Sequence, residues 1–224
     1  LAGAFMGEGV STIFGMMGSA TMYWADALEK LGIRKIETRH EGVGCGMADG
    51  WARATRTPGV CTATKGPGVT QLATALVTAS RAGSPLVAFV GECAATDHEN
   101  AQQLDQARFA AACETGFVRV NSPDTVDDDV RKAFYLARLE SRPIMLSAPV
   151  DIQQMKFDGE EPYKPSTALF PARRVVPPDP EKLEQAANLI SACRKPVIIV
   201  GQGAMWSGAG DAVIKLGNRI GALI

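Results

Sequence analysis

Residues 58–92 read PGVCTATKGPGVTQLATALVTASRAGSPLVAFVGE. Within this stretch, 59–63 and 86–90 are short apolar runs bounded by glycine or proline, which is typical of buried strands. Residues 69–81 lie between them and repeat apolar side chains at helical spacing. A strand, a helix and a second strand in this order predict one unit of a parallel sheet.

The same alternation continues on both sides of this stretch. Further strands are predicted at 11–14, 35–38, 117–120 and 144–147, and further helices at 21–31, 42–55, 103–113 and 125–140. The last helix carries three aspartates, Asp127 to Asp129, in its first turn, where negative charge suits the helix dipole. Six strands separated by helices predict an α/β fold with a doubly wound six-stranded parallel sheet and helices on both faces.

The pattern changes after Pro149, where prolines interrupt the chain at 162, 165, 171, 177 and 178. Beyond them the sequence predicts a helix at 179–193, a strand at 196–200, a glycine-rich turn at 201–210, a helix from Asp211 and a strand from Ala222. We therefore expect a first domain at 1–155, a linker at 156–178 and a second α/β domain at 179–224. Two strands cannot close a parallel-sheet core, so we expect this second domain to be incomplete and the chain to be trimmed.

The composition argues against several classes of partner. The 23 Lys and Arg residues nearly balance the 24 Asp and Glu residues, and both are scattered, so neither nucleic acid nor a membrane surface is an expected partner. The apolar runs are too short to span a bilayer. The five cysteines form no C-x-x-C pair and predict reduced thiols in a cytoplasmic protein rather than a metal site.

Ligands of doubly wound sheets gather at the carboxyl ends of the strands, so the loops at 15–19, 39–42, 65–71 and 91–93 are the candidate site. Glu41 opens the helix at 42–55, where it either complements the helix dipole or carries chemistry. Four glycines in this helix, at 42, 44, 46 and 50, each cost about 1 kcal/mol relative to alanine. They indicate that another element or subunit approaches the helix closely.

Three stretches resemble one known family. They are RHEGVGCGMADGWARA at 39–54, the segment from PGVC to GPGVT at 58–70, and SPLVAFVG at 84–91. Residues 1–151 closely resemble the amino-terminal domain of acetolactate synthase and its relatives, among them benzoylformate decarboxylase. Residues 196–204 resemble the opening of that family's middle domain.

The resemblance implies thiamine diphosphate as the cofactor and assigns roles to individual residues. Glu41 matches the glutamate that hydrogen-bonds N1′ of the aminopyrimidine ring and so promotes proton removal from the thiazolium C2. The other matches are Gly66, Pro67, Gly68 and Gln71 beside the pyrimidine, Gln102 as a second catalytic residue, and Met17, Gly18, Ser19 and His98 in the substrate pocket. The family usually has asparagine at position 71, an aromatic residue at 101 and Tyr-Pro-Gly-Gly at 16–19, which indicates a changed substrate pocket.

The family binds Mg²⁺ and the diphosphate through a third domain that contains Gly-Asp-Gly and Asn-Asn. Neither motif occurs in this sequence. The resemblance therefore implies a lyase or transferase that forms or cleaves a C–C bond next to the carbonyl of a 2-oxo acid or a similar small molecule, and that is inactive as this chain alone. The active form is expected to be a homodimer or homotetramer of longer chains, with the cofactor at the subunit interface.

Two other functions are compatible with parts of the sequence. A nicotinamide-binding oxidoreductase is suggested by the sheet and by the glycines at 201–210, but their spacing differs from G-x-G-x-x-G and no matching acidic residue follows. A non-enzymatic homologue would retain the fold as an interaction module. The presence of Glu41 argues against it.

Overall fold

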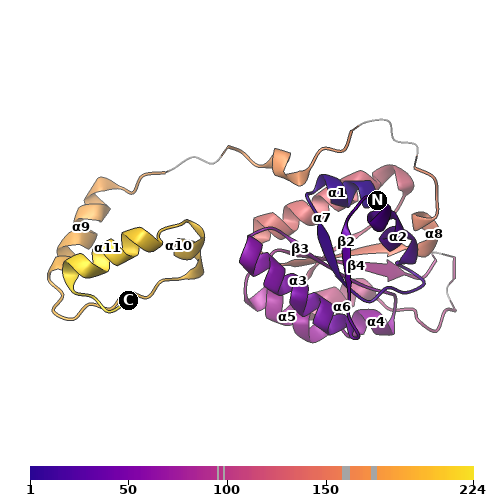
Figure 1. Cartoon of the computed structure of the whole chain (residues 1–224), viewed down its shortest axis with the longest axis horizontal. Coiled ribbons are helices and arrows are strands. Elements are labelled where there is room, and N and C mark those ends of the chain that lie inside the picture. Colours follow the sequence, from indigo (N-terminus) through magenta and orange to yellow (C-terminus); the bar gives the residue numbers. More distant parts are fainter. Residues whose placement is uncertain (95, 98, 158–161, 173–175) are drawn as a thin grey trace. The chain divides into compact units, whose positions relative to one another are not determined.

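The computed structural model describes residues 1–94, 96–97, 99–157, 162–172 and 176–224 (Figure 1). These residues form two compact units, Leu1–Pro171 and Ala172–Ile224. The first unit includes residues 162–171, which the sequence analysis assigned to the linker. The domain boundaries at residues 155 and 178 remain predictions.

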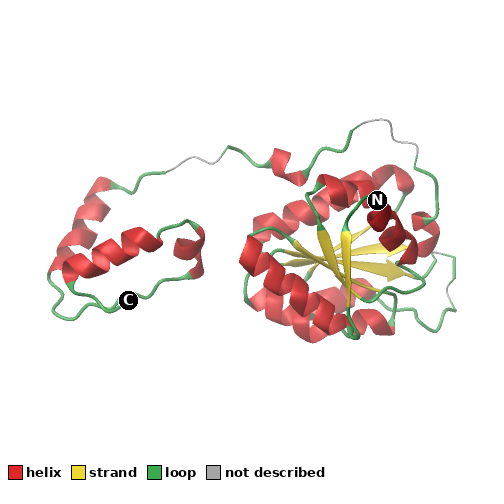
Figure 2. Ribbon diagram, in the orientation of Figure 1, coloured by secondary structure: helices red, strands yellow, loops and turns green. Residues whose placement is uncertain are grey.

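The first unit is built on one parallel sheet of six strands, with the order β2-β1-β3-β4-β6-β5. The strands are β1 Thr12–Gly15, β2 Arg34–Glu37, β3 Gly59–Ala63, β4 Leu86–Glu92, β5 Gly116–Arg119 and β6 Pro143–Pro149. Figure 2 shows the strands enclosed by helices, and the predicted doubly wound α/β sheet is confirmed. In the register, Val60 lies beside Val87, and Val87 lies beside Ile144.

The helices of this unit follow the predicted order with some differences. They are α1 Ala2–Gly7, α2 Met22–Lys30, α3 Glu41–Thr55, α4 Pro67–Thr70, α5 Ala73–Arg81, α6 Gln106–Ala112, α7 Val126–Glu140 and α8 Val150–Gln153, with 3₁₀ turns η1 Pro123–Thr125 and η2 Ser166–Leu169. The helix predicted at 69–81 is divided into α4 and α5. The helix predicted from 103 begins at 106, because the Asp105 carboxylate caps it by accepting from the Arg108 amide at 3.0 Å.

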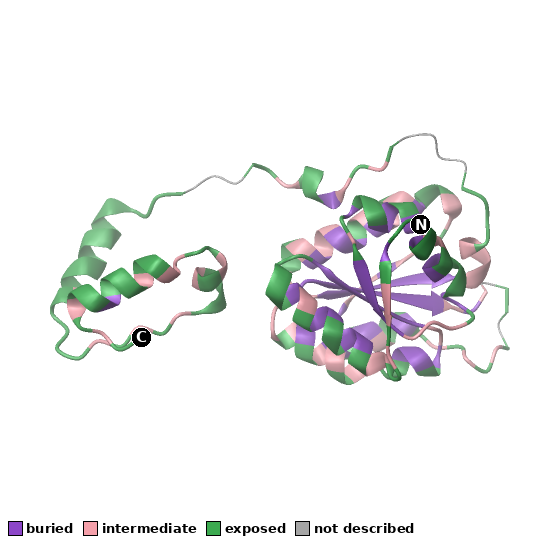
Figure 3. Cartoon of the chain, viewed as in Figure 1, coloured by how far each residue is buried: buried purple, intermediate pink, exposed green. Residues whose placement is uncertain are grey.

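Apolar side chains fill both faces of the sheet. One core cluster gathers aromatic residues from α1, α2, β4 and α7, namely Phe5, Trp24, Phe89 and Phe134. The other packs α3, α5 and α6 against the opposite face. Along β4, Phe89 belongs to the first cluster, whereas its neighbours Ala88 and Val90 belong to the second. Because both faces are covered (Figure 3), the loops at the strand ends are the places left for a ligand.

A buried carboxylate joins residues 163–166 to the rest of the first unit. The Glu8 side chain is 0% exposed and accepts hydrogen bonds from the Tyr163 hydroxyl at 2.7 Å and from the Ser166 amide at 2.6 Å and hydroxyl at 2.7 Å. Arg138 completes the group with a donor nitrogen 3.3 Å from the carboxylate. Burial, followed by the hydrogen bond to Glu8, raises the pKa of Tyr163. Three donors and one counter-charge therefore depend on Glu8.

Replacing Glu8 with alanine is expected to destabilise the first unit by roughly 3 kcal/mol, since it leaves Arg138 without its counter-charge and the three donors without their acceptor. Urea unfolding would measure this in a Trp206→Phe background, so that fluorescence reports on the first unit. The matched control is Glu29→Ala, which removes an exposed ion pair to Lys35 and should cost less than about 1 kcal/mol. Equal effects of the two substitutions would contradict the assignment.

The second unit contains α9 Pro180–Ser191, α10 Gln202–Trp206 and α11 Gly210–Ile220. The predicted strands meet only as one parallel bridge between Val197 and Leu223. The predicted glycine-rich turn at 201–210 contains α10, which the sequence analysis missed because a helix of one turn has no apolar period. Ile199 remains 92% exposed and Leu189 72% exposed, as in an α/β domain that lacks part of its sheet.

Candidate functional site

The loops that follow β1 and β3 pack against each other at the carboxyl end of the sheet. A Cβ on Gly18 would lie 2.5 Å from the Thr64 Cβ, so the two loops leave no room for a side chain there. The Ala20 amide donates to the Thr64 hydroxyl at 3.5 Å. Both loops belong to the region that the sequence analysis selected.

Glu41 lies against the second of these loops. It is the first residue of α3 and is half-buried. A Cβ added to Gly68 would be 3.2 Å from Glu41 Oε1, so the carboxylate approaches the backbone of the loop. Within the part of the chain that the structure describes, no side chain or amide hydrogen-bonds to this carboxylate. Its proton-accepting oxygens are therefore available to a ligand.

Gln102 belongs to the segment between β4 and α6 and lies against the other end of the same loop, at Gly66. Gly66 has φ +57°, in the left-handed region that favours glycine, and a Cβ there would be 2.9 Å from the Gln102 Cα. The Gln102 amide donates to the Asn100 side chain at 3.0 Å, which holds this turn. The short loop from Gly66 to Gly68 thus contacts both residues predicted to be catalytic.

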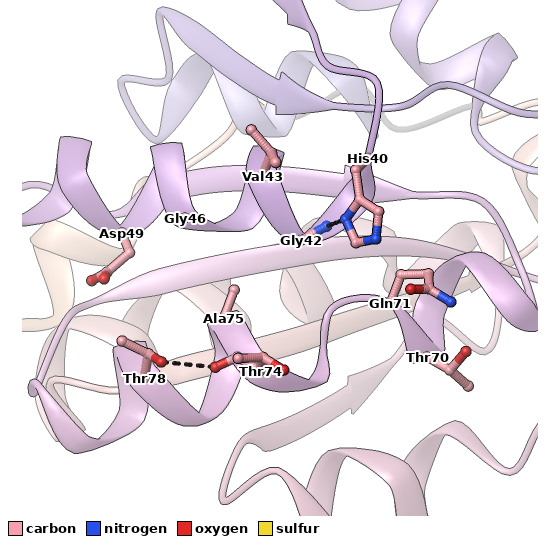
Figure 4. A pocket seen from close by; sticks show the side chains of 10 residues that line it. All are labelled: His40, Gly42, Val43, Gly46, Asp49, Thr70, Gln71, Thr74, Ala75 and Thr78. Carbon is pink, nitrogen blue, oxygen red and sulfur yellow. Dashed lines mark hydrogen bonds between the residues drawn. The ribbon is translucent and has the colours of Figure 1, made fainter.

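Gln71 marks one end of a groove between α3 and α5 (Figure 4). Its carbonyl oxygen would be 2.9 Å from a Cβ on Gly42, so the end of α4 touches the start of α3. The groove encloses about 580 Å³ and is lined by His40, Gly42, Val43, Gly46, Asp49, Thr70, Gln71, Thr74, Ala75 and Thr78. Asp49 is neutralised by two hydrogen bonds from Arg53, at 2.9 and 2.6 Å, so small and uncharged groups dominate the surface.

The remaining residues that were predicted to form the site differ in how exposed they are. Pro67 is exposed at the start of α4 and Ser19 is exposed in the loop after β1. Met17 packs against the first core cluster from a half-buried position. His98 lies outside the described residues, so its predicted role in the pocket stays a prediction.

A cluster at the ends of β4, β5 and β6 was not predicted as a unit. Arg119 donates to both oxygens of Glu92, at 2.8 and 3.1 Å, and Ser147 donates to the same carboxylate at 3.0 Å. The hydrogen bond to Glu92 raises the pKa of Arg119. Through these hydrogen bonds Glu92 links the ends of β4, β5 and β6, and its carboxylate is already occupied by protein donors. The position of Glu92 directly after an apolar strand could have marked it as a site residue. Its partners Arg119 and Ser147 lie far away in the sequence, so the cluster itself could not be predicted.

The thiols and possible metal ligands give no second site. Cys45, Cys61, Cys93 and Cys113 are buried and free, and Cys193 is exposed and free. Burial raises the pKa of the Cys93 thiol, which disfavours the reactive thiolate, although nearby Lys65 acts in the opposite direction. Among the described residues, no three His, Cys, Asp or Glu side chains are grouped to hold a metal ion, and no helix is long and apolar enough to cross a membrane.

Comparison with known proteins agrees with this geometry. Residues 1–109, which carry Glu41, the 66–68 loop and Gln102, match the family described as thiamine pyrophosphate enzyme, N-terminal TPP binding domain. Residues 1–109 of the first unit belong to this family.

Three relatives of this thiamine pyrophosphate enzyme domain extend the match into the second unit. A probable acetolactate synthase large subunit of Methanocaldococcus jannaschii is 31% identical over 221 residues, which are 97% of this chain and 37% of the relative. A probable 2-ketoarginine decarboxylase of Pseudomonas aeruginosa is 33% identical over 96% of the chain and 38% of its own length. Acetolactate synthase 1 of Nicotiana tabacum is 34% identical over 206 residues, which are 89% of this chain and 31% of the relative. The chain thus spans about a third of these relatives.

The glycines of α3 in this thiamine pyrophosphate enzyme domain differ in what they contact, which predicts opposite effects of alanine. A Cβ on Gly44 would lie 2.5 Å from the Gly15 Cα, so Gly44→Ala should destabilise the unit by about 2 kcal/mol. Gly46 has nothing within 4 Å, so Gly46→Ala should stabilise it by up to about 1 kcal/mol. The urea concentrations at which the two variants of this chain are half unfolded, compared with that of the wild type, test this difference between Gly44 and Gly46. A destabilising Gly46→Ala would contradict it.

Proposed function

We propose that this chain is the N-terminal part of a longer thiamine diphosphate-dependent enzyme that forms or cleaves a C–C bond next to a carbonyl. The observation that carries the proposal is the Glu41 carboxylate, which lies half-buried against Gly68 without a hydrogen-bond partner in the described part of the chain. A carboxylate in this position can share a proton with a ring nitrogen of a bound ligand.

The residues present fit the aminopyrimidine half of the cofactor. Glu41 would bind a ring nitrogen, and the backbone of Gly66 to Gly68 would allow a flat ring to approach, because a Cβ on Gly68 would lie 3.2 Å from the Glu41 carboxylate and crowd the ring there. Gln71 and Gln102 would border the same ring. When bound, thiamine diphosphate supplies the carbon that adds to a carbonyl and accepts the electrons released when the neighbouring bond breaks.

The diphosphate half has no matching residues in the described part of the chain. Mg²⁺ prefers carboxylate and amide oxygens together with phosphate, and among these residues no three His, Cys, Asp or Glu side chains are grouped to hold a metal ion. We assign the Mg²⁺ site to a part of the longer protein beyond this sequence, and we expect the chain alone to be inactive. A cytoplasmic location stays a prediction.

The proposed substrate is a 2-oxo acid or a similar small carbonyl compound, and the proposed reaction is that of a lyase or a transferase. Met17, Gly18, Ser19 and His98 are the proposed pocket residues, since 17–19 follow β1 at the same sheet edge as Glu41. The relatives are named both as synthases and as a decarboxylase, and those two outcomes use the same early chemistry.

We also propose that a second subunit covers α3, in a homodimer or homotetramer. Val43 and Met47 are exposed on this helix, and neither Gly46 nor Gly50 has any atom within 4 Å of an added Cβ. Each of these glycines costs about 1 kcal/mol in a helix and serves no contact within the chain. Close packing of a partner over the groove beside α3 would explain them.

Replacing Glu41 with glutamine in the longer protein is expected to slow C2-proton exchange of bound thiamine diphosphate at least about a hundredfold, because the amide cannot share a proton in the same way. Deuterium exchange followed by NMR measures this rate. Glu37→Gln is the matched control, since Glu37 is an exposed carboxylate at the end of β2 and should leave the rate unchanged.

Three other outcomes would each reject part of the proposal. An unchanged exchange rate in Glu41→Gln would remove Glu41 from the mechanism. Cofactor binding without any C2 exchange in the wild type would favour a non-enzymatic homologue. Binding of NADH, with no heat on titration of thiamine diphosphate and Mg²⁺, would favour the oxidoreductase alternative.

A further inference from the structure

His40 is the N-cap residue of α3 and uses its imidazole as the cap. Its backbone is extended, with φ −155° and ψ 135°, and its Nδ1 accepts a hydrogen bond from the Gly42 amide at 3.0 Å. N-caps are usually serine, threonine, aspartate or asparagine, which offer an oxygen for this purpose. In this helix a ring nitrogen takes that place.

The backbone of His40 is held as firmly as its side chain. Its carbonyl oxygen accepts from the Val43 amide at 3.1 Å and from the Gly44 amide at 3.3 Å. The Thr38 hydroxyl donates to the same oxygen at 2.9 Å. Three amides at the start of the helix therefore end on one residue, which itself is tied to the strand end before it.

Glu41 lies between this cap and Gly42. A Cβ on Gly42 would be 3.1 Å from the His40 Nδ1 and 2.9 Å from the Gln71 carbonyl oxygen, so the ring and the loop enclose the turn from two sides. The Glu41 carboxylate has no hydrogen bond of its own within the described ranges. The backbone of the turn fixes where the Glu41 Cα and Cβ lie, and the cap holds that backbone.

We propose that His40 is a positioning residue, which aims the Glu41 carboxylate through the cap rather than by touching the substrate. The inference rests on the proposed function of Glu41. It requires a neutral imidazole with its proton on Nε2, because Nδ1 must accept. Figure 4 shows the ring between Gly42 and Gln71 at the end of the groove.

The test compares His40→Ala, which removes the acceptor, with His40→Asn, which keeps an acceptor at a cap but removes the ring. In this chain, NMR-detected amide exchange at Gly42 should quicken about fivefold in His40→Ala and remain within about twofold of wild type in His40→Asn. In the longer protein, C2-proton exchange should slow about tenfold in His40→Ala and recover to within about threefold in His40→Asn.

The two readouts separate this inference from the proposed function. If His40→Asn slows C2 exchange as much as His40→Ala while its amide exchange is normal, the ring acts on the reaction directly and positioning is rejected. If His40→Ala leaves amide exchange at Gly42 unchanged, the cap itself is rejected. If the wild type shows no C2 exchange, the proposed function fails and positioning fails with it, whereas amide exchange still decides the cap.

Discussion

The close approach of α3 to the loops at the carboxyl end of the sheet is the constraint on which the site depends. The helix can begin where it does because Gly44 lies directly over the Gly15 backbone and Gly42 lies against the Gln71 carbonyl. A Cβ on Gly44 would lie 2.5 Å from the Gly15 Cα, so a side chain there would force the helix and the loop apart. That displacement would carry the Glu41 carboxylate away from Gly68.

The rest of the first unit holds the loops that α3 contacts in place. Apolar packing on both faces of the sheet keeps the strands in register, so the loops after β1, β3 and β4 always meet at one edge. Glu92, Arg119 and Ser147 tie together the ends of three strands with hydrogen bonds of 2.8 to 3.1 Å. A rigid edge keeps the start of α3, and with it the Glu41 backbone, at a fixed place beside the 66–68 loop.

Much of this arrangement could be predicted from sequence, because its signals are local. The central strands β1, β3, β4 and β6 are buried and mostly apolar, so they are recognisable as short runs, whereas edge strand β2 (Arg34–Glu37) is partly exposed and its signal is weaker. Glu41 stands out by its place after a strand and before glycines. The contacts of Glu8 with Tyr163 and Ser166 could not be predicted, since more than 150 residues separate the partners. Nor could the glycines of α3 be divided into packed and open ones, because the difference lies in what faces them in space.

The measurement that tests the central claim most directly is a crystal structure of the longer protein with thiamine diphosphate and Mg²⁺. The account predicts a Glu41 oxygen within about 3 Å of a nitrogen of the aminopyrimidine ring, with the ring against the backbone of Gly66 to Gly68. It also predicts a second subunit over the groove beside α3. A cofactor bound elsewhere, or bound with Glu41 turned toward solvent, would contradict the account.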